Sequence, residues 1–148
     1  SGGIVDINAA QQINQSMFPI AKTFNEVRSL NTIGTAYTNL MVFSLDESIS
    51  GATCSVQNVE VKILAEAMPT GGLFGQWKLE TNYFRYESVT SSFPTGTAVT
   101  VSGPGAPDAR TPLWAATMAA SGPTGFVMVR GHSGVNWVGV MQRIRVTG

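Results

Sequence analysis

From Thr35 onward the chain alternates between apolar and polar residues, and this period of two constrains its fold more than any other feature. The clearest segment runs from Val59 to Ala67, where every second residue is Val, Ile or Ala and the residues between are mostly charged. Because successive side chains of a strand point to opposite faces, this segment is predicted to form a half-buried strand, with Glu60 and Glu66 facing outward.

Similar alternation, or a high content of β-branched residues, predicts further strands at residues 37–45, 76–85, 97–102, 113–119, 126–130 and 137–146. Clusters of Gly and Pro separate these segments and indicate turns. The sequence therefore predicts an all-β domain over residues 34–148, an antiparallel β-sandwich or jelly roll.

Residues 1–33 differ from this body and are expected to form an N-terminal arm or a connection to a stalk. Apolar residues recur at spacings of four and three, as in a coiled coil, at Ile13, Met17, Ile20, Phe24 and Val27. Pro19 lies inside the run and would interrupt a helix. Three interpretations stay open: a short helix that starts near Pro19, an extended arm, and a spacing that arose by chance.

The composition limits the partners of this chain. Nine Lys and Arg balance nine Asp and Glu, and charged residues make up only 12% of the sequence. Nucleic acid and anionic lipid surfaces both need a basic face, so neither is an expected partner. Sparse charge also favours self-association. No apolar segment is long enough to span a membrane, and no signal peptide is recognised, so we expect synthesis in the cytoplasm without membrane insertion.

No constellation of catalytic residues is recognisable, so the chain is predicted not to be an enzyme and to need no metal or other cofactor. The carboxylates lack the pattern of a glycosidase pair. His132 lies between Gly131 and Ser133-Gly134, as a polar turn residue would. Cys54 is expected to be a buried thiol, since no base stands near it in sequence. A small esterase or lyase that uses His132 is the enzymatic alternative.

Aromatic residues remain as candidates for core packing or for stacking on a sugar. The three tryptophans, Trp77, Trp114 and Trp137, are expected in the core. In Phe84-Arg85-Tyr86 the two rings share one face of a strand and the arginine takes the other. Both faces then carry large side chains, as expected if one face is the core and the other contacts a partner subunit or a ligand.

From about Val59 to its end the chain resembles the C-terminal β-sandwich domain of bacteriophage tail fibres, tailspikes and tail needles. The segments that carry the resemblance are 59–65, 77–85, 114–118, 127–131, 135–140 and 144–146. Gly139 departs from the usual small apolar residue. The resemblance implies a virion (tail) location, a homotrimer, and adsorption to a bacterial surface glycan or outer-membrane receptor. A monomeric carbohydrate-binding module and a purely structural capsid-decoration or trimerisation domain are the alternatives.

On this interpretation the receptor meets loops at the tip, which we expect at residues 69–75, 102–112 and 131–137. Side chains there that can make hydrogen bonds or stack are Asp108, Arg110, His132, Asn136 and Trp137. The expected oligomer interface residues are Phe84, Tyr86 and Met141.

Overall fold

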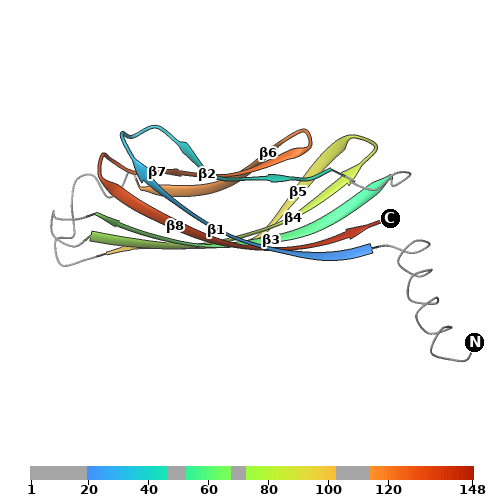
Figure 1. The fold of residues 1–148 in the computed structure, drawn as a ribbon, viewed down its shortest axis with the longest axis horizontal. Coiled ribbons are helices and arrows are strands. Elements are labelled where there is room, and N and C mark those ends of the chain that lie inside the picture. The colour runs from blue at the N-terminus through green and yellow to red at the C-terminus, as the bar shows by residue number, and fades with distance from the viewer. Residues whose placement is uncertain (1–19, 47–52, 68–72, 103–113) are drawn as a thin grey trace, which may run out of the picture.

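A computed structural model describes residues 20–46, 53–67, 73–102 and 114–148, and these ranges form a sandwich of two antiparallel sheets (Figure 1). Every regular element in these ranges is a strand: β1 (Ile20–Thr32), β2 (Thr38–Ser44), β3 (Cys54–Ala67), β4 (Leu73–Tyr86), β5 (Val89–Ser102), β6 (Ala115–Ser121), β7 (Thr124–Arg130) and β8 (Val135–Thr147). The predicted all-β antiparallel sandwich is thus confirmed.

The larger sheet has the strand order β1-β8-β3-β4-β5, and the smaller one has the order β2-β7-β6. Two tight hairpins, β4–β5 and β6–β7, join neighbouring strands. The first turns at Glu87 and Ser88, both with positive φ (46° and 68°), as a two-residue type I′ turn requires. Strand β8 pairs with both β1 and β3, so the last strand in the sequence is an interior strand of the larger sheet.

The core lies between the two sheets and follows the alternation of the strands. In β8 every second residue is buried, so Trp137 and Met141 point inward, and the aliphatic residues between them, such as Val138 and Val140, point outward. All three tryptophans are buried, as predicted. At Gly139 an added Cβ would lie 2.8 Å from Leu40 Cδ2 of the opposite sheet. Glycine at this position therefore allows the close approach of the two sheets.

Strand β1 differs from the expected arm. Thirteen residue pairs, from Ile20↔Thr147 to Thr32↔Val135, join it to β8 as the edge of the larger sheet. The sandwich therefore includes residues 20–32, ahead of residue 34, and Phe24 and Val27 lie on opposite faces of a strand and not on one helical face. Neither face of an edge strand is fully buried, so its sequence need not alternate between apolar and polar residues. The remainder of the expected arm, residues 1–19, lies outside the described residues.

Cys54 also differs from the prediction of a buried thiol. It opens β3, is half-buried, and has its Sγ 3.6 Å from the carbonyl oxygen of Gly148. Because Cys54 stands at the end of the strand and on its outward face, the opposite sheet does not cover it.

Candidate binding surface on the larger sheet

The outward face of the five-stranded sheet carries most of the exposed large apolar side chains in the described part of the chain. Twelve of the fifteen belong to it by strand register: Val27, Val56, Leu64, Phe74, Phe84, Tyr86, Val89, Phe93, Val138, Val140, Ile144 and Val146. Scattered exposed apolar residues are normal, but a concentration on one face marks an interaction surface.

A polar band crosses the middle of this face. Asn58 Nδ2 donates hydrogen bonds to Asn82 Oδ1 (2.8 Å) and to Glu80 Oε2 (3.3 Å). Thr95 Oγ1 donates to Glu80 Oε1 at 2.8 Å. The hydrogen bond from Thr95 and, to a smaller extent, the one from Asn58 lower the pKa of the Glu80 carboxyl. The band divides the apolar residues into two patches.

The first patch, here called the aromatic patch, lies at the end of the sheet where β4 turns into β5. Phe84 and Tyr86 are 40% and 48% exposed, and their rings are nearly parallel (9°) with centroids 6.3 Å apart. Val56 and Val146 are register neighbours on the adjoining strands. Arg85, between the two rings in sequence, points inward and is buried, so the predicted division of this segment between two faces is confirmed.

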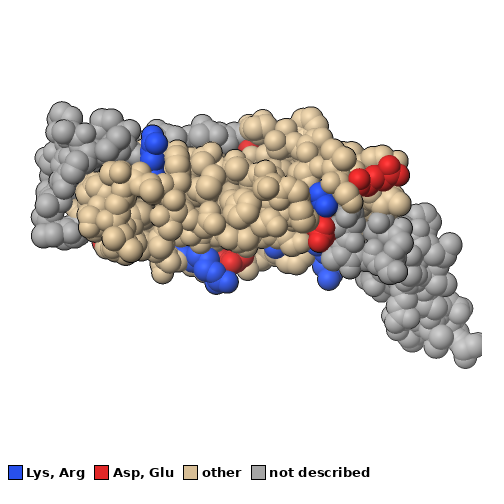
Figure 2. Space-filling view, turned by 90° about the horizontal axis from the view of Figure 1, so that it is seen from above, with Lys and Arg blue, Asp and Glu red and all other residues tan. Residues whose placement is uncertain are grey.

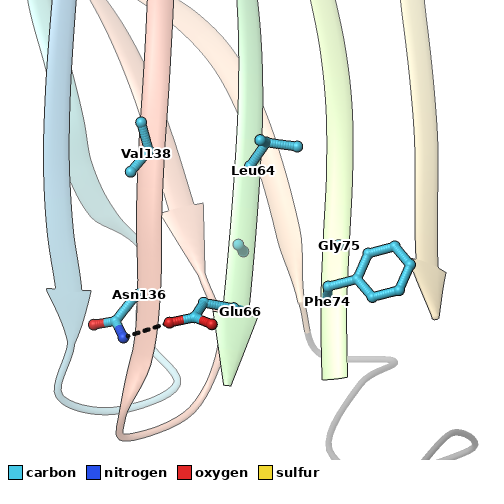
Figure 3. A pocket seen from close by; sticks show the side chains of 7 residues that line it. Leu64, Glu66, Phe74, Gly75, Asn136 and Val138 are labelled. Atoms are coloured by element: carbon cyan, nitrogen blue, oxygen red, sulfur yellow. Dashed lines mark hydrogen bonds between the residues drawn. The ribbon is translucent and has the colours of Figure 1, made fainter. Parts of the chain in front are cut away.

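The second patch, here called the groove patch, lies at the opposite end and contains a hollow of about 520 Å³. Figure 3 shows Val138 of β8, Leu64 of β3 and Phe74 of β4 projecting from the same face. The polar rim is Asn136, whose Nδ2 donates to Glu66 Oε1 at 3.2 Å. The hollow thus combines an apolar lining with a few fixed polar groups, as small-ligand sites and interface pockets do.

Of the predicted receptor-binding residues that the structure describes, only Asn136 lies on this face. Its Oδ1 also accepts a hydrogen bond from Asn31 Nδ2 of β1 at 2.7 Å. Asp108 and Arg110 lie outside the described residues, as does most of the 102–112 loop. The expected contacts of these two residues therefore stay predictions.

His132 and Trp137 belong to the core and not to an exposed tip. His132 is 7% exposed, and its Nδ1 accepts a hydrogen bond from Trp114 Nε1 at 2.8 Å. Trp137 is fully buried, with its ring 5.1 Å from that of Trp77. The turn at Ser133-Gly134 is so short that β8 begins at Val135, and the alternation then carries Trp137 inward. In this structure neither side chain is accessible for contact with a receptor.

Met141 differs from the other two expected interface residues. It is fully buried on the inward face of β8, whereas Phe84 and Tyr86 are exposed on the outward face. The residues that sequence reasoning missed are the aliphatic neighbours of Met141 on β8 and the lining of the groove patch. Alternation showed that Val138, Val140, Ile144 and Val146 share a face, but both faces of this strand are bulky, so periodicity alone did not say which one is outside.

The described residues offer little catalytic chemistry. Glu60 and Glu80 are register partners on the outward face, but hydrogen bonds lower the pKa of Glu80, whereas a glycosidase acid needs a raised one. No group of three or more His, Cys, Asp or Glu within the described ranges could hold a metal ion. No helix in the same ranges is long and apolar enough to cross a membrane.

Charged groups are sparse on the opposite side of the molecule. Figure 2, seen from the side of the three-stranded sheet, shows most of the surface without charge, and the few charged side chains stand near its edges. Electrostatic repulsion between copies of the chain is therefore weak.

No protein-family model and no curated protein matches this sequence. Among solved structures, the tailspike protein of Acinetobacter baumannii phage AM24 is similar with a TM-score of 0.44 and 9% identity, over 85% of this chain and 26% of that one. The tailspike protein of Acinetobacter phage vB_ApiP_P1 gives a TM-score of 0.36 and 14% identity, over 80% of this chain and 20% of that one. The chain thus spans about a quarter or less of each tailspike, and similarity at this level assigns no function.

Proposed function

We propose that this chain is a domain of a phage tail protein that forms a homotrimer through the outward face of its five-stranded sheet and takes part in adsorption to the bacterial surface. The observation that carries the proposal is the concentration of exposed apolar side chains on that face. The trimer and the bacterial target come from the sequence resemblance to phage tail domains.

The two patches have different parts in this proposal. Burial of apolar surface drives association, and aromatic residues contribute most per side chain. Phe84 and Tyr86 are therefore the proposed anchors of the interface. The groove patch, which includes the exposed side chains of Leu64 and Val138, takes apolar side chains of a neighbouring copy. The loop at residues 102–112, with Asp108 and Arg110, stays the proposed contact with the receptor.

Light scattering at low micromolar concentration tests the assembly. We expect a mass near three times 15.7 kDa. Val140→Lys places a charge in the interface and should shift the mass toward that of the monomer. Val42→Lys is the matched control, because Val42 is similarly exposed (50% against 47%) but lies on the smaller sheet. A monomeric wild-type chain, or equal effects of the two substitutions, would contradict the assembly.

Binding to host cells tests adsorption. Fluorescently labelled wild-type protein should bind susceptible cells, and Asp108→Ala with Arg110→Ala should reduce binding without changing the mass in solution. Unchanged binding by this double variant would remove the receptor assignment of the loop and leave the fold unaffected.

A second candidate function is that of a monomeric carbohydrate-binding module. The nearly parallel exposed rings of Phe84 and Tyr86 favour it, because aromatic faces aligned on a sheet can stack on successive sugar rings. This function predicts a monomer, and it predicts that Phe84→Ala abolishes glycan binding in calorimetry while the fold is kept. A trimer with these rings buried would exclude it.

A further inference from the structure

Three arginines lie between the sheets, on the inward face near the end of β8. Arg85, Arg143 and Arg145 are 6%, 9% and 5% exposed. Arg85 belongs to β4 and the other two belong to β8, with β3 between these strands. Burying a charged group is costly unless an opposite charge or hydrogen bonds compensate it, so each guanidinium needs partners.

Arg85 has such partners. Its Nη1 donates hydrogen bonds to the carbonyl oxygen of Ser88 (3.2 Å) and to Thr90 Oγ1 (2.8 Å). Its Nε lies 3.5 Å from Asp46 Oδ1. The charge of Arg85 is thus largely compensated within the chain.

Arg143 is only partly compensated. Its Nη1 donates to the carbonyl oxygen of Ser44 (3.2 Å) and to Gln57 Oε1 (3.0 Å), and its guanidinium carbon lies 4.3 Å from the centre of the Phe24 ring. Its Nε is buried and has no hydrogen-bond acceptor among the described residues. Burial, and then the positive charge of Arg145, lower the pKa of Arg143, and the negative charge of Glu26 opposes them with a smaller effect.

Arg145 has still fewer partners. Its Nε is buried and has no hydrogen-bond partner among the described residues, and its guanidinium carbon lies 5.1 Å from the centre of the Phe24 ring. Thr147, two residues further along the same inward face, has a buried Oγ1 that also has no partner there. Of the nearby carboxylates, Asp46 faces Arg85, and Glu26 lies 3.0 Å from Arg28 while its charge also acts on Arg143.

We propose that Arg143, Arg145 and Thr147 form a binding site for an oxyanion, which is the carboxylate or phosphate group of a ligand. A guanidinium presents its donors in a planar fork that matches two oxygens of such a group. The stacked Phe24 ring holds both guanidiniums in place, so little side-chain entropy is lost on binding. The site is independent of the assembly proposed above, because it lies on the inward face.

Thermal unfolding of the full chain tests the site. Sodium phosphate and sodium glucuronate are titrated at constant ionic strength, with glucose as the neutral control. We expect a saturable rise of the unfolding midpoint, about 5–8 °C at one hundred times the dissociation constant. Arg145→Gln should abolish this rise. Lys62→Gln should retain it, because Lys62 is an exposed cation on the outward face of the same sheet, away from the site. A response to phosphate alone identifies a phosphate site, and a response to both identifies a general oxyanion site.

Absence of a saturable response to either anion in the wild type, or an unchanged response in Arg145→Gln, would overturn the proposal. Broadening of the phosphate ³¹P resonance by wild-type protein gives a readout that needs no variant, and its absence at millimolar phosphate would count against phosphate binding. The variant Arg145→Met removes the buried charge. In chloride alone it should unfold at a higher temperature than the wild type, and in saturating oxyanion it should unfold at a lower temperature than the wild type. A lower unfolding midpoint than the wild type under both conditions would refute the claim that the charge of Arg145 is uncompensated.

Discussion

Gly125 is expected to be among the least replaceable residues of the described chain, because a large ring occupies the space beside it. Gly125 on β7 pairs across the strand with Phe43 on β2. A Cβ added at Gly125 would lie 2.3 Å from both Cε2 and Cζ of the Phe43 ring, a distance that real Cβ atoms do not reach. Alanine at this position therefore forces the ring to move.

The ring has little room to move. Phe43 is 4% exposed, its centroid lies 6.0 Å from that of Tyr83, and the Arg143 guanidinium carbon lies 5.3 Å from it. Overpacking of this kind typically costs about 1–3 kcal/mol. We expect Gly125→Ala to lower the free energy of unfolding by about 2–3 kcal/mol, at the upper end of that range, because the clash is with ring atoms that are hemmed in on two sides.

Urea denaturation followed by tryptophan fluorescence measures this change. Gly34→Ala is the matched control, because nothing lies within 4 Å of the added Cβ and Gly34 is not among the positive-φ glycines. We expect it to leave the stability within about 0.5 kcal/mol of the wild type. Combining Gly125→Ala with Phe43→Leu should be less damaging than the sum of the two single changes, by about 1 kcal/mol. Equal stability of Gly125→Ala and Gly34→Ala, or strict additivity in the double variant, would refute the reasoning.

Two further predictions concern pH and the β4–β5 turn. Burial raises the pKa of Tyr83 to about 12 from the ordinary value of 10.0. As the pH rises, the Tyr83 hydroxyl therefore loses its proton in the unfolded chain before it does so in the folded one. The buried neutral hydroxyl thus contributes its full share of the folding free energy below pH 10. This share, about 2–3 kcal/mol in total, is lost as the pH rises toward 12. Urea denaturation at pH 9 and pH 11.5 should show a steeper loss in the wild type than in Tyr83→Phe, and parallel losses would contradict this. In the turn, Glu87→Asn with Ser88→Gly suits the positive φ angles and should raise the unfolding midpoint by about 2–4 °C in calorimetry. A lower unfolding midpoint would show that the positive φ angles of the turn do not limit the stability of the wild type.

Much of the fold could be predicted because alternation is a local signal. The segment at residues 59–67 was expected as a strand and forms most of β3, and the division of Phe84-Arg85-Tyr86 between two faces follows from the same rule. Strand β1 escaped because an edge strand with one neighbour buries neither face fully, and its residues Phe24 and Val27 happen to fit a helical spacing.

The candidate site was harder to predict because it depends on which face the smaller sheet covers. Trp137 and Val138 are both apolar neighbours on β8, and only the position of the smaller sheet decides that the first is core and the second is surface. His132 looked like a polar turn residue, but the hydrogen bond from Trp114, eighteen positions earlier, draws it inside. Both features depend on tertiary contacts, so no local sequence pattern could predict them.

The place of β8 has a consequence for the order of folding. Strand β1 pairs only with β8 in the described sheet, and β8 is made after every other described strand. During synthesis β1 and β3 must therefore wait with open edges until β8 leaves the ribosome and is inserted between them. Contacts so distant in sequence make folding slow, and open edges of this length invite pairing with other chains. For the trimer proposed above, that interval is also when strands of different copies can pair with one another.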